Sequence, residues 1–305
     1  MTRRRGFTEA DVPDQSGKCL IVTGANTGVG FHVARVLAAR GARVLLGCRD
    51  RGRAEAAMAR IGRLTPGADL AFLPLDQADL ASVRTAAELA GREPRLDALV
   101  NNAGVMIPPL TRTRQGFELQ FGVNHLGCFA LTALLLPKLA ESAGRAVITA
   151  SLAHRRGRID WDDLNAEKGY RRFPRYRMSK LANALFLFEL DRRLRAAGSP
   201  VTAVGCHPGL AGTELGRHAG PFRFVTALVN LAFNTPAMGA WPALQAATAP
   251  VTPGGYYGPT GLGEARGASG EAWRAPRGLD PAASRRLWEL SVAMTGIDPG
   301  LAPAD

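Results

Sequence analysis

Lysine and cysteine are scarce in this sequence of 305 residues. Only four of its 38 basic residues are lysines, and its four cysteines are Cys19, Cys48, Cys128 and Cys206. The cysteines are far apart and form no CxxC pair, which argues against a disulfide-dense secreted scaffold and against a zinc cluster. We therefore expect no metal site, and we expect four reduced thiols packed inside a cytoplasmic protein.

Acidic residues are fewer than basic ones, 26 against 38, so the net charge is +12 and the pI is about 10.5. A basic balance of this kind is typical of proteins that bind nucleic acids or anionic membranes. Here, however, the cations are scattered and follow no stripe along one helix. We expect no specific nucleic-acid partner.

Long uninterrupted apolar runs are also lacking. Arginines follow Met1 almost directly with no apolar stretch behind them, so the sequence predicts no signal peptide. The stretch Phe224–Gly263 has no charged residue, but prolines and amide side chains interrupt it. A membrane-spanning helix needs about 20 predominantly apolar residues. We therefore expect no transmembrane segment, although peripheral contact with a membrane stays open.

Short apolar runs alternate with helical periodicity over the first 210 residues. Runs typical of buried strands lie at 19–22, 43–46, 70–75, 96–100, 146–149 and 201–206, and helical patterns cover 29–39, 53–61, 80–90, 118–139 and 177–197. Strands that are apolar throughout and separated by helices predict a parallel sheet covered on both faces. Right-handed crossovers make such a sheet doubly wound. Because no linker divides this part, we expect one α/β domain.

A glycine-rich turn follows the first predicted strand and opens the first predicted helix. It reads Gly24, Ala25, Asn26, Thr27, Gly28, Val29 and Gly30. Glycines allow a tight turn and let backbone N–H groups approach a phosphate, and the helix N-terminus adds positive potential. The turn therefore predicts a dinucleotide site.

The end of the second predicted strand indicates which dinucleotide is bound. An acidic residue there would bind the ribose 2′-hydroxyl of NAD, whereas an arginine accommodates the 2′-phosphate of NADP. Cys48 takes the acidic position, Arg49 follows it, and Asp50 comes next. We expect NADP(H), with NAD(H) as the alternative, since Asp50 could cap the next helix or pair with Arg49.

Tyr176 and Lys180 are spaced by one helical turn, so both lie on one helix face. A free tyrosine has a pKa near 10, which makes it a poor acid–base group at neutral pH. A nearby ammonium would lower that pKa. The pair is therefore a candidate general acid–base unit.

Further polar residues follow the strands at the edge where open α/β sheets bind ligands. Ser151 comes after the fifth predicted strand, and Asn101-Asn102-Ala103-Gly104 comes after the fourth. With TGxxxGxG, NNAG, Asn124 in the long middle helix, the serine and YxxxK in this order, the sequence resembles the short-chain dehydrogenase/reductase family. The resemblance covers roughly residues 17–213.

This resemblance implies roles for the candidate catalytic residues. Tyr176 would exchange a proton with the substrate oxygen, and Lys180 would lower the pKa of Tyr176 and bond to the nicotinamide ribose. Ser151 would hydrogen-bond the substrate oxygen, and Asn124 would anchor a water between Lys180 and solvent. The implied cofactor contacts are Asp76 with the adenine, Asn102, Ala103 and Gly104 along the adenosine, Pro208 and Gly209 against the nicotinamide, and Thr213 near its carboxamide. Three histidines near these motifs, His125, His154 and His207, are expected to be structural.

The resemblance also implies a single Rossmann-type domain with about seven parallel strands. We divide it into an N-terminal arm (1–16), a cofactor-binding and catalytic core (17–213), a substrate-covering segment with the last strand (214–263) and a C-terminal extension (264–305). The family forms dimers or tetramers, so a homodimer or homotetramer is expected.

Within the family, Ser151-Leu152-Ala153-His154, Gly47-Cys48-Arg49-Asp50 and the residues after Ser179 look like the retinol-dehydrogenase-like branch, with WW-domain oxidoreductases among its relatives. The branch implies a lipophilic alcohol, aldehyde or ketone as substrate. The uncharged stretch Phe224–Gly263 could then be an apolar lid, or it could be core or subunit interface. Arginines near Ser151 and Tyr176 could form a solvated surface or a site mouth that attracts an anionic substrate.

The leading interpretation is an NADP(H)-dependent oxidoreductase that interconverts an alcohol and a carbonyl. One alternative is a cofactor-binding scaffold or sensor without turnover. Another is a light-dependent enzyme of the protochlorophyllide-reductase type.

Overall fold

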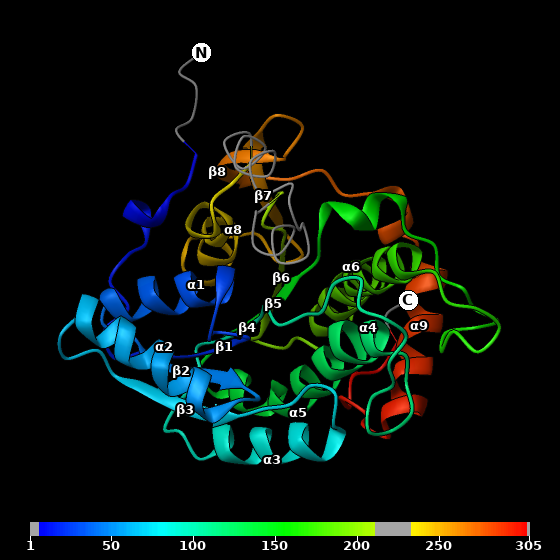
Figure 1. Ribbon diagram of the computed structural model, residues 1–305, viewed down its shortest axis with the longest axis horizontal. Coiled ribbons are helices and arrows are strands. Elements are labelled where there is room, and N and C mark those ends of the chain that lie inside the picture. Colours follow the sequence, from blue (N-terminus) through cyan, green and yellow to red (C-terminus); the bar gives the residue numbers. More distant parts are fainter. Residues whose placement is uncertain (1–5, 211–232, 304–305) are drawn as a thin grey trace.

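The computed structural model describes residues 6–210 and 233–303. Its central feature is a sheet in the order β3-β2-β1-β4-β5-β6-β7-β8, which runs through the middle of the molecule (Figure 1). The strands are β1 (Cys19–Thr23), β2 (Arg43–Cys48), β3 (Leu70–Pro74), β4 (Ala98–Asn101), β5 (Arg145–Thr149), β6 (Thr202–Cys206), β7 (Tyr256–Gly261) and β8 (Arg266–Glu271). Strands β1 to β7 are parallel, which confirms the doubly wound α/β architecture.

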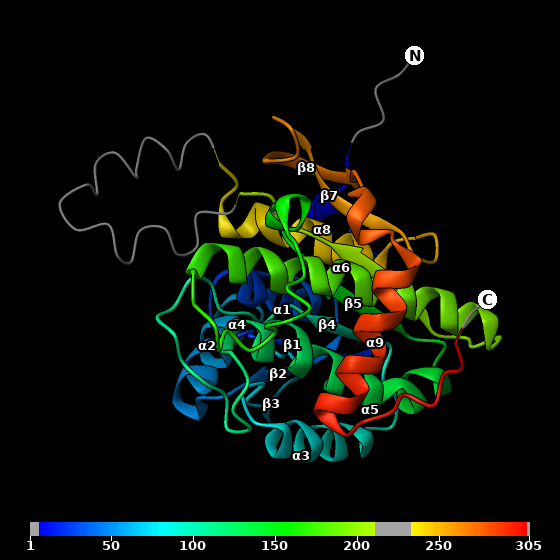
Figure 2. The same ribbon diagram turned by 90° about the vertical axis from the view of Figure 1, so that its right-hand side faces the viewer.

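Helices cover both faces of the sheet, as Figures 1 and 2 show. One face packs against α1 (Gly28–Ala39), α2 (Arg51–Leu64) and α8 (Pro236–Thr248). The other packs against α3 (Leu80–Gly91), α5 (Gly127–Glu141) and α6 (Arg172–Ala196), with α9 (Pro281–Thr295) beside α6. Short helical segments are η1 (Glu9–Asp11), α4 (Leu119–Phe121), η2 (Gly122–Leu126), η3 (Leu152–Arg156) and η5 (Pro276–Gly278).

Strand β1 illustrates why two separate cores form. Leu20 and Val22 join the hydrophobic cluster under α1 and α8, whereas Ile21 joins the cluster under α3, α5 and α6. Successive side chains of a strand point to opposite faces, so both positions must be apolar when both faces are covered. This is why the strand is a continuous apolar run in the sequence.

The sheet has eight strands, one more than expected. The additional strand, β8, runs antiparallel to β7 and pairs Tyr257 with Glu271 and Gly258 with Gly270. It lies in the part of the chain interpreted as a C-terminal extension. Its sequence, RGASGE, has no apolar alternation because it forms the sheet edge, where little of it is buried.

Two helix predictions also differ from the structure. Helix α6 begins at Arg172, before the expected start at Arg177, because Pro174 is tolerated in the first turn of a helix. The single helix expected over 118–139 is α4, a π-helical segment (η2) and α5 in succession. A π-segment adds one residue to a turn and changes which side chains face the neighbouring elements.

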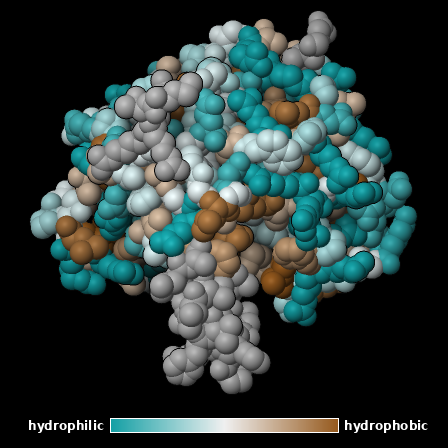
Figure 3. Space-filling view, turned by 90° about the horizontal axis from the view of Figure 1, so that it is seen from above, coloured by the Kyte–Doolittle hydropathy of each residue, from teal (hydrophilic) through white to brown (hydrophobic). Residues whose placement is uncertain are grey.

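Part of the uncharged stretch Phe224–Gly263 lies within the described residues, and its helix α8 packs into the core. Ala240, Ala243 and Leu244 of α8 are buried against α1 and the sheet. Among the described residues, the run Leu119–Glu141 is long and apolar enough to cross a membrane, but 89% of its most apolar window is buried inside the fold. Seen from above, hydrophilic side chains cover most of the surface, and a few hydrophobic ones gather near its centre (Figure 3).

Candidate active site

A cleft of about 1000 Å³ lies at the carboxyl ends of the parallel strands. Residues from the segments that follow β1 to β6 line it, among them Gly24, Arg49, Asp76, Asn102, Ser151 and Pro208. Strand order reverses between β1 and β4, and open α/β sheets bind ligands at such a switch point. The structure therefore brings the cofactor and catalytic candidates into one cleft.

The glycine turn has the conformation that the sequence predicts. Gly24 and Gly28 have φ of +67° and +58°, values that side chains disfavour. A Cβ on Gly30 would lie 2.4 Å from both Asn102 Nδ2 and Gly24 O, so only glycine lets α1 approach this closely.

The N-terminus of α1 is open toward the cleft. Its N-cap residue, Thr27, makes no side-chain capping hydrogen bond, and Gly28, Val29 and Gly30 line the cleft. The first N–H groups of a helix have no partner inside the helix. Together with the helix dipole, they fit a pyrophosphate, so the residues present suit a dinucleotide cofactor.

Asn102 joins the ends of β1 and β4. Its Nδ2 donates to Thr23 O at 2.9 Å, while Thr23 Oγ1 accepts from the backbone N–H groups of Asn102 and Ala103 at 3.0 and 2.9 Å. These bonds hold Ala103 and Gly104 along the floor of the cleft. Asn102 therefore has a clear structural function beside its predicted cofactor contact.

The end of β2 carries exposed charged side chains of both signs. Arg49 is 75% exposed at its side chain and lies 4.0 Å from Asp76 Oδ2. Asp50 caps α2, since its Oδ1 accepts from Arg53 N at 2.9 Å. The sequence left open whether Asp50 caps the next helix or pairs with Arg49, and the structure shows the cap. Arg53, which sequence reasoning missed, lines the cleft as a second arginine.

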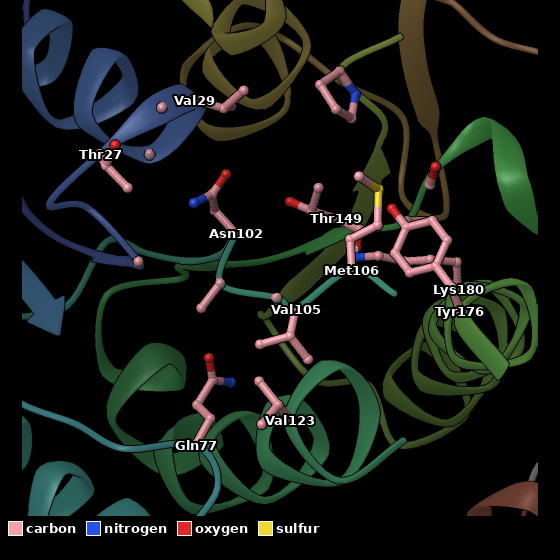
Figure 4. Close-up of a pocket in the computed structure, with 18 of the residues that line it drawn as sticks. Thr27, Val29, Gln77, Asn102, Val105, Met106, Val123, Thr149, Tyr176 and Lys180 are labelled. Atoms are coloured by element: carbon pink, nitrogen blue, oxygen red, sulfur yellow. Dashed lines mark hydrogen bonds between the residues drawn. The ribbon is translucent and has the colours of Figure 1, made fainter. Parts of the chain in front are cut away.

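Gln77 is a second residue that sequence reasoning missed. It is 6% exposed and lines the cleft, yet neither its Nε2 nor its Oε1 has a hydrogen-bond partner among the described residues. In Figure 4 it points into the pocket from the side opposite Thr27. A Cβ on Gly127 would lie 2.6 Å from Gln77 O, so α5 packs tightly against it. A buried amide without partners is costly, and a bound ligand would satisfy it.

Tyr176 and Lys180 lie together at the other end of the cleft (Figure 4). Lys180 is buried, and its Nζ donates to Thr149 O at 3.2 Å. Burial lowers the pKa of Lys180 to about 8. The ammonium is therefore still mostly protonated at neutral pH.

The pKa of Tyr176 differs from the expectation. Burial raises it above its ordinary value of 10, and a hydrogen bond with the Ser151 side chain offsets part of this rise. The ammonium of Lys180 donates instead to the carbonyl oxygen of Thr149. Tyr176 is thus protonated at neutral pH, which suits a proton donor.

Asn124 ties the catalytic helix to the loop after β4. Its Oδ1 accepts from Val105 N at 2.7 Å, and its Nδ2 donates to Val105 O and to Ser179 Oγ, both at 2.9 Å. Ser179 in turn donates to Tyr176 O at 2.9 Å. The Asn124 amide thus already makes three hydrogen bonds within the protein. The water that the resemblance implies would need the second lone pair of Oδ1.

The remaining predicted residues lie as follows. Pro208 and Gly209 line the cleft after β6, and Gly209 has a φ of +72°. Thr213 lies outside the described residues. His125 and His154 are buried, and burial lowers their pKa values to about 3 and about 4. This agrees with the structural role expected for them.

The fold and the cleft define a nicotinamide-dependent oxidoreductase, and comparison with known proteins agrees. The chain matches the short chain dehydrogenase family over residues 18–222, and it belongs to that family. It acts as an oxidoreductase on CH–OH groups.

Its relatives place it in the retinol-dehydrogenase-like branch. It is 43% identical to Retinol dehydrogenase 14 of Mus musculus, over 92% of this chain and 86% of that protein. A crystal structure of an uncharacterized protein from Mycobacterium Paratuberculosis superposes with a TM-score of 0.81 at 37% identity, covering 97% of this chain and all of that one. A protein of Beutenbergia cavernae, described as a NAD(P)-dependent gluconate 5-dehydrogenase with bound NADP, has a TM-score of 0.61 at 25% identity, covering 77% and 91%.

Proposed function

We propose that the protein is an NADP(H)-dependent oxidoreductase that interconverts a lipophilic alcohol and its carbonyl compound, with Tyr176 as general acid and base. One observation carries this proposal. The glycine turn at one end and the Tyr176–Ser151–Lys180 group at the other line the same cleft. Such an arrangement places a dinucleotide and a reacting oxygen side by side.

The cofactor proposal depends on the cations at the end of β2. Arg49 and Arg53 line the cleft where the adenosine ribose would lie, and guanidinium groups bind phosphate in a bidentate manner. The carboxylate nearest the end of β2 is Asp50, which caps α2 and pairs with Arg53 at 3.7 Å. The bound NADP in the Beutenbergia cavernae protein supports the same choice.

The proposed proton transfer follows from the protonation states of Tyr176 and Lys180. When bound, the reduced nicotinamide supplies a hydride. Tyr176 donates its hydroxyl proton to the oxygen of a carbonyl substrate, and Ser151 orients that oxygen by a second hydrogen bond. Lys180 supplies a buried positive charge beside them. Because burial raises its pKa, Tyr176 holds at neutral pH the proton that carbonyl reduction requires.

The lining of the cleft supports a lipophilic substrate. Nine large apolar side chains line the cleft, namely Val105, Met106, Ile107, Leu119, Val123, Leu152, Phe173, Leu210 and Phe233. Burial of apolar surface favours binding of an apolar molecule there. Retinal is the first carbonyl to test, given the name of the mouse relative. Arg156 and Arg177 also line the cleft, so kcat/KM measured at rising ionic strength checks for an anionic substrate.

The test is a panel of aldehydes and ketones, retinal included, with NADPH oxidation read at about 340 nm in the dark. Turnover in the dark excludes the light-dependent alternative. Tyr176→Phe should bind NADPH as the parent does but lose about 10²- to 10⁴-fold in kcat. Binding of NADPH without turnover of any carbonyl would favour the scaffold alternative, and an unchanged kcat in the variant would contradict the role of Tyr176.

We further propose a cytoplasmic protein that associates as a homodimer or homotetramer. Sedimentation of the purified chain and fractionation of cells check the two points separately.

A further inference from the structure

The turn between β7 and β8 places one carboxylate among three donors from different elements. Glu264 Oε2 accepts from His207 Nε2 at 2.9 Å and from the guanidinium of Arg155, and its Oε1 accepts from Trp273 N at 2.8 Å. Glu264 adopts a φ of +68°, which is uncommon for a residue with a side chain. The backbone therefore holds an unfavourable conformation that brings this carboxylate inward.

His207 connects that carboxylate to the segment after β6. It is fully buried, and its Nδ1 accepts from Gly209 N at 3.2 Å. Because a backbone N–H is always a donor, Nδ1 must be unprotonated, and Nε2 must carry the hydrogen that Glu264 accepts. A Cβ on Gly258 would lie 2.2 Å from His207 Nε2, so β7 leaves space for the ring through a glycine.

The same hairpin holds the segment at further points. Leu210 N donates to Ala265 O at 3.0 Å, next to Glu264 in the chain. From another direction, Asn234 Nδ2 donates to Pro208 O at 3.1 Å, and its Oδ1 accepts from Gly267 N at 3.1 Å. Pro208, Gly209 and Leu210 therefore form a braced wall of the cleft, which we call the 208–210 wall.

The 208–210 wall lies at the catalytic end of the cleft. Strand β6 pairs with β5, whose end carries Ser151, whereas Arg49 follows β2, at the other side of β1 and β4. Arg155, the second cation bound by Glu264, lies in η3, directly after Ser151, and its guanidinium stacks over the Trp273 ring at 5.1 Å. Glu264 thus joins the Ser151 segment to the 208–210 wall.

We propose that Glu264 is a positioning residue that fixes His207 as the Nε2–H tautomer and thereby holds the 208–210 wall against the nicotinamide half of the cofactor. The proposal rests on the proposed function, since it assumes a dinucleotide in the cleft. It assigns to the β7–β8 hairpin a function in the active site, in addition to forming the edge of the sheet.

A binding experiment separates this function from general stability. Glu264→Gln keeps the shape but leaves one acceptor oxygen for three donors. We expect its Kd for NADPH to rise about tenfold, while its Kd for adenosine 2′,5′-bisphosphate, which lacks the nicotinamide half, stays as in the parent. Glu271→Gln removes an exposed carboxylate of the same hairpin and should change neither constant. Equal losses for both ligands, or none, in Glu264→Gln overturn the proposal.

A second measurement needs no variant. In the ¹⁵N spectrum of the parent chain at neutral pH, His207 should show a protonated Nε2 and an unprotonated Nδ1. The opposite tautomer, or a doubly protonated ring, overturns the proposal while leaving the proposed function intact. A parent chain that binds the bisphosphate but not NADPH overturns both the proposed function and this inference.

Discussion

The Nζ of Lys180 donates a hydrogen bond of 3.2 Å to the carbonyl oxygen of Thr149, so the cation of the catalytic helix is anchored to the end of β5. Asn183, one turn further along α6, donates to the same oxygen at 3.1 Å. The carbonyl thus ties α6 to the end of β5, two residues before Ser151. The position of the charge follows from the fold itself.

The first prediction concerns the pH dependence that this buried charge imposes. Lys180 has a pKa of about 8, below the ordinary 10.5, because burial disfavours the charged form. The ammonium is therefore lost as the pH rises through about 8, and kcat/KM for carbonyl reduction should fall there. Lys180→Arg keeps its charge and should move the fall to higher pH. A parent profile that stays flat to about pH 10 would contradict this role.

The same pKa shift predicts an opposite trend in stability. Between pH 8 and 10.5 the unfolded chain holds a proton on this lysine that the folded chain has released. The contribution of Lys180 to the free energy of unfolding should therefore increase as the pH rises through this window. Urea titrations of the parent and Lys180→Met at several pH values check it, since the variant should lack this contribution.

The second prediction concerns Arg49 and the cofactor. Arg49→Ala should raise the KM for NADPH about tenfold, because a charge-assisted phosphate contact is lost, and leave the KM for NADH unchanged. Arg63→Ala, in the last turn of α2, is the matched control and should change neither value. A parent enzyme that prefers NADH would show that Arg49 binds no 2′-phosphate.

The third prediction concerns Gln77. A glutamine amide pairs with the edge of adenine by two hydrogen bonds, so we expect Gln77→Leu to weaken NADPH binding about tenfold. The 1,N6-etheno derivative of NADP, in which N6 has no hydrogen to donate, should bind less tightly than NADP to the parent. In Gln77→Leu the two cofactors should bind alike. If the etheno group costs the same affinity in both proteins, Gln77 does not contact the adenine.

The fourth prediction compares two glycines by free energy of unfolding. Gly30→Ala should lower it by about 2 kcal/mol or more, because the new Cβ would meet Asn102 and Gly24 at 2.4 Å. Gly62→Ala, inside α2 with no atom within 4 Å of its Cβ, should raise it by about 0.5–1 kcal/mol. Urea denaturation measures both. Similar values for the two variants would contradict the close approach at Gly30.

The sequence predicts β1 to β6 as apolar runs, and five of these six strands are almost wholly buried between the two helix layers. It does not predict β8. Arg266–Glu271 is an edge strand, and its pairing partner and main-chain bonds determine it more than its side chains do. The π-segment Gly122–Leu126 is equally hidden, since one extra residue in a turn leaves the apolar pattern nearly unchanged.

The active site also contains residues that the sequence predicts and residues that it does not. Tyr176, Lys180, Ser151 and the glycine turn are recognised because their chemistry requires these residue types at these spacings. Gln77 and Glu264 could not be found in this way, because an isolated polar residue in a sequence does not show whether it faces solvent. The lower pKa expected for Tyr176 was wrong for a related reason. Helical spacing places Lys180 on the same face, but burial raises the pKa of Tyr176 by more than its hydrogen bond with Ser151 lowers it.

The hairpin that carries Glu264 has a consequence for biosynthesis. During translation the N-terminal part of the chain leaves the ribosome first. The glycine turn and the catalytic helix emerge first, whereas the brace behind the 208–210 wall emerges near the end. A chain that stops before this hairpin would therefore lack Glu264 and the contacts that brace the 208–210 wall.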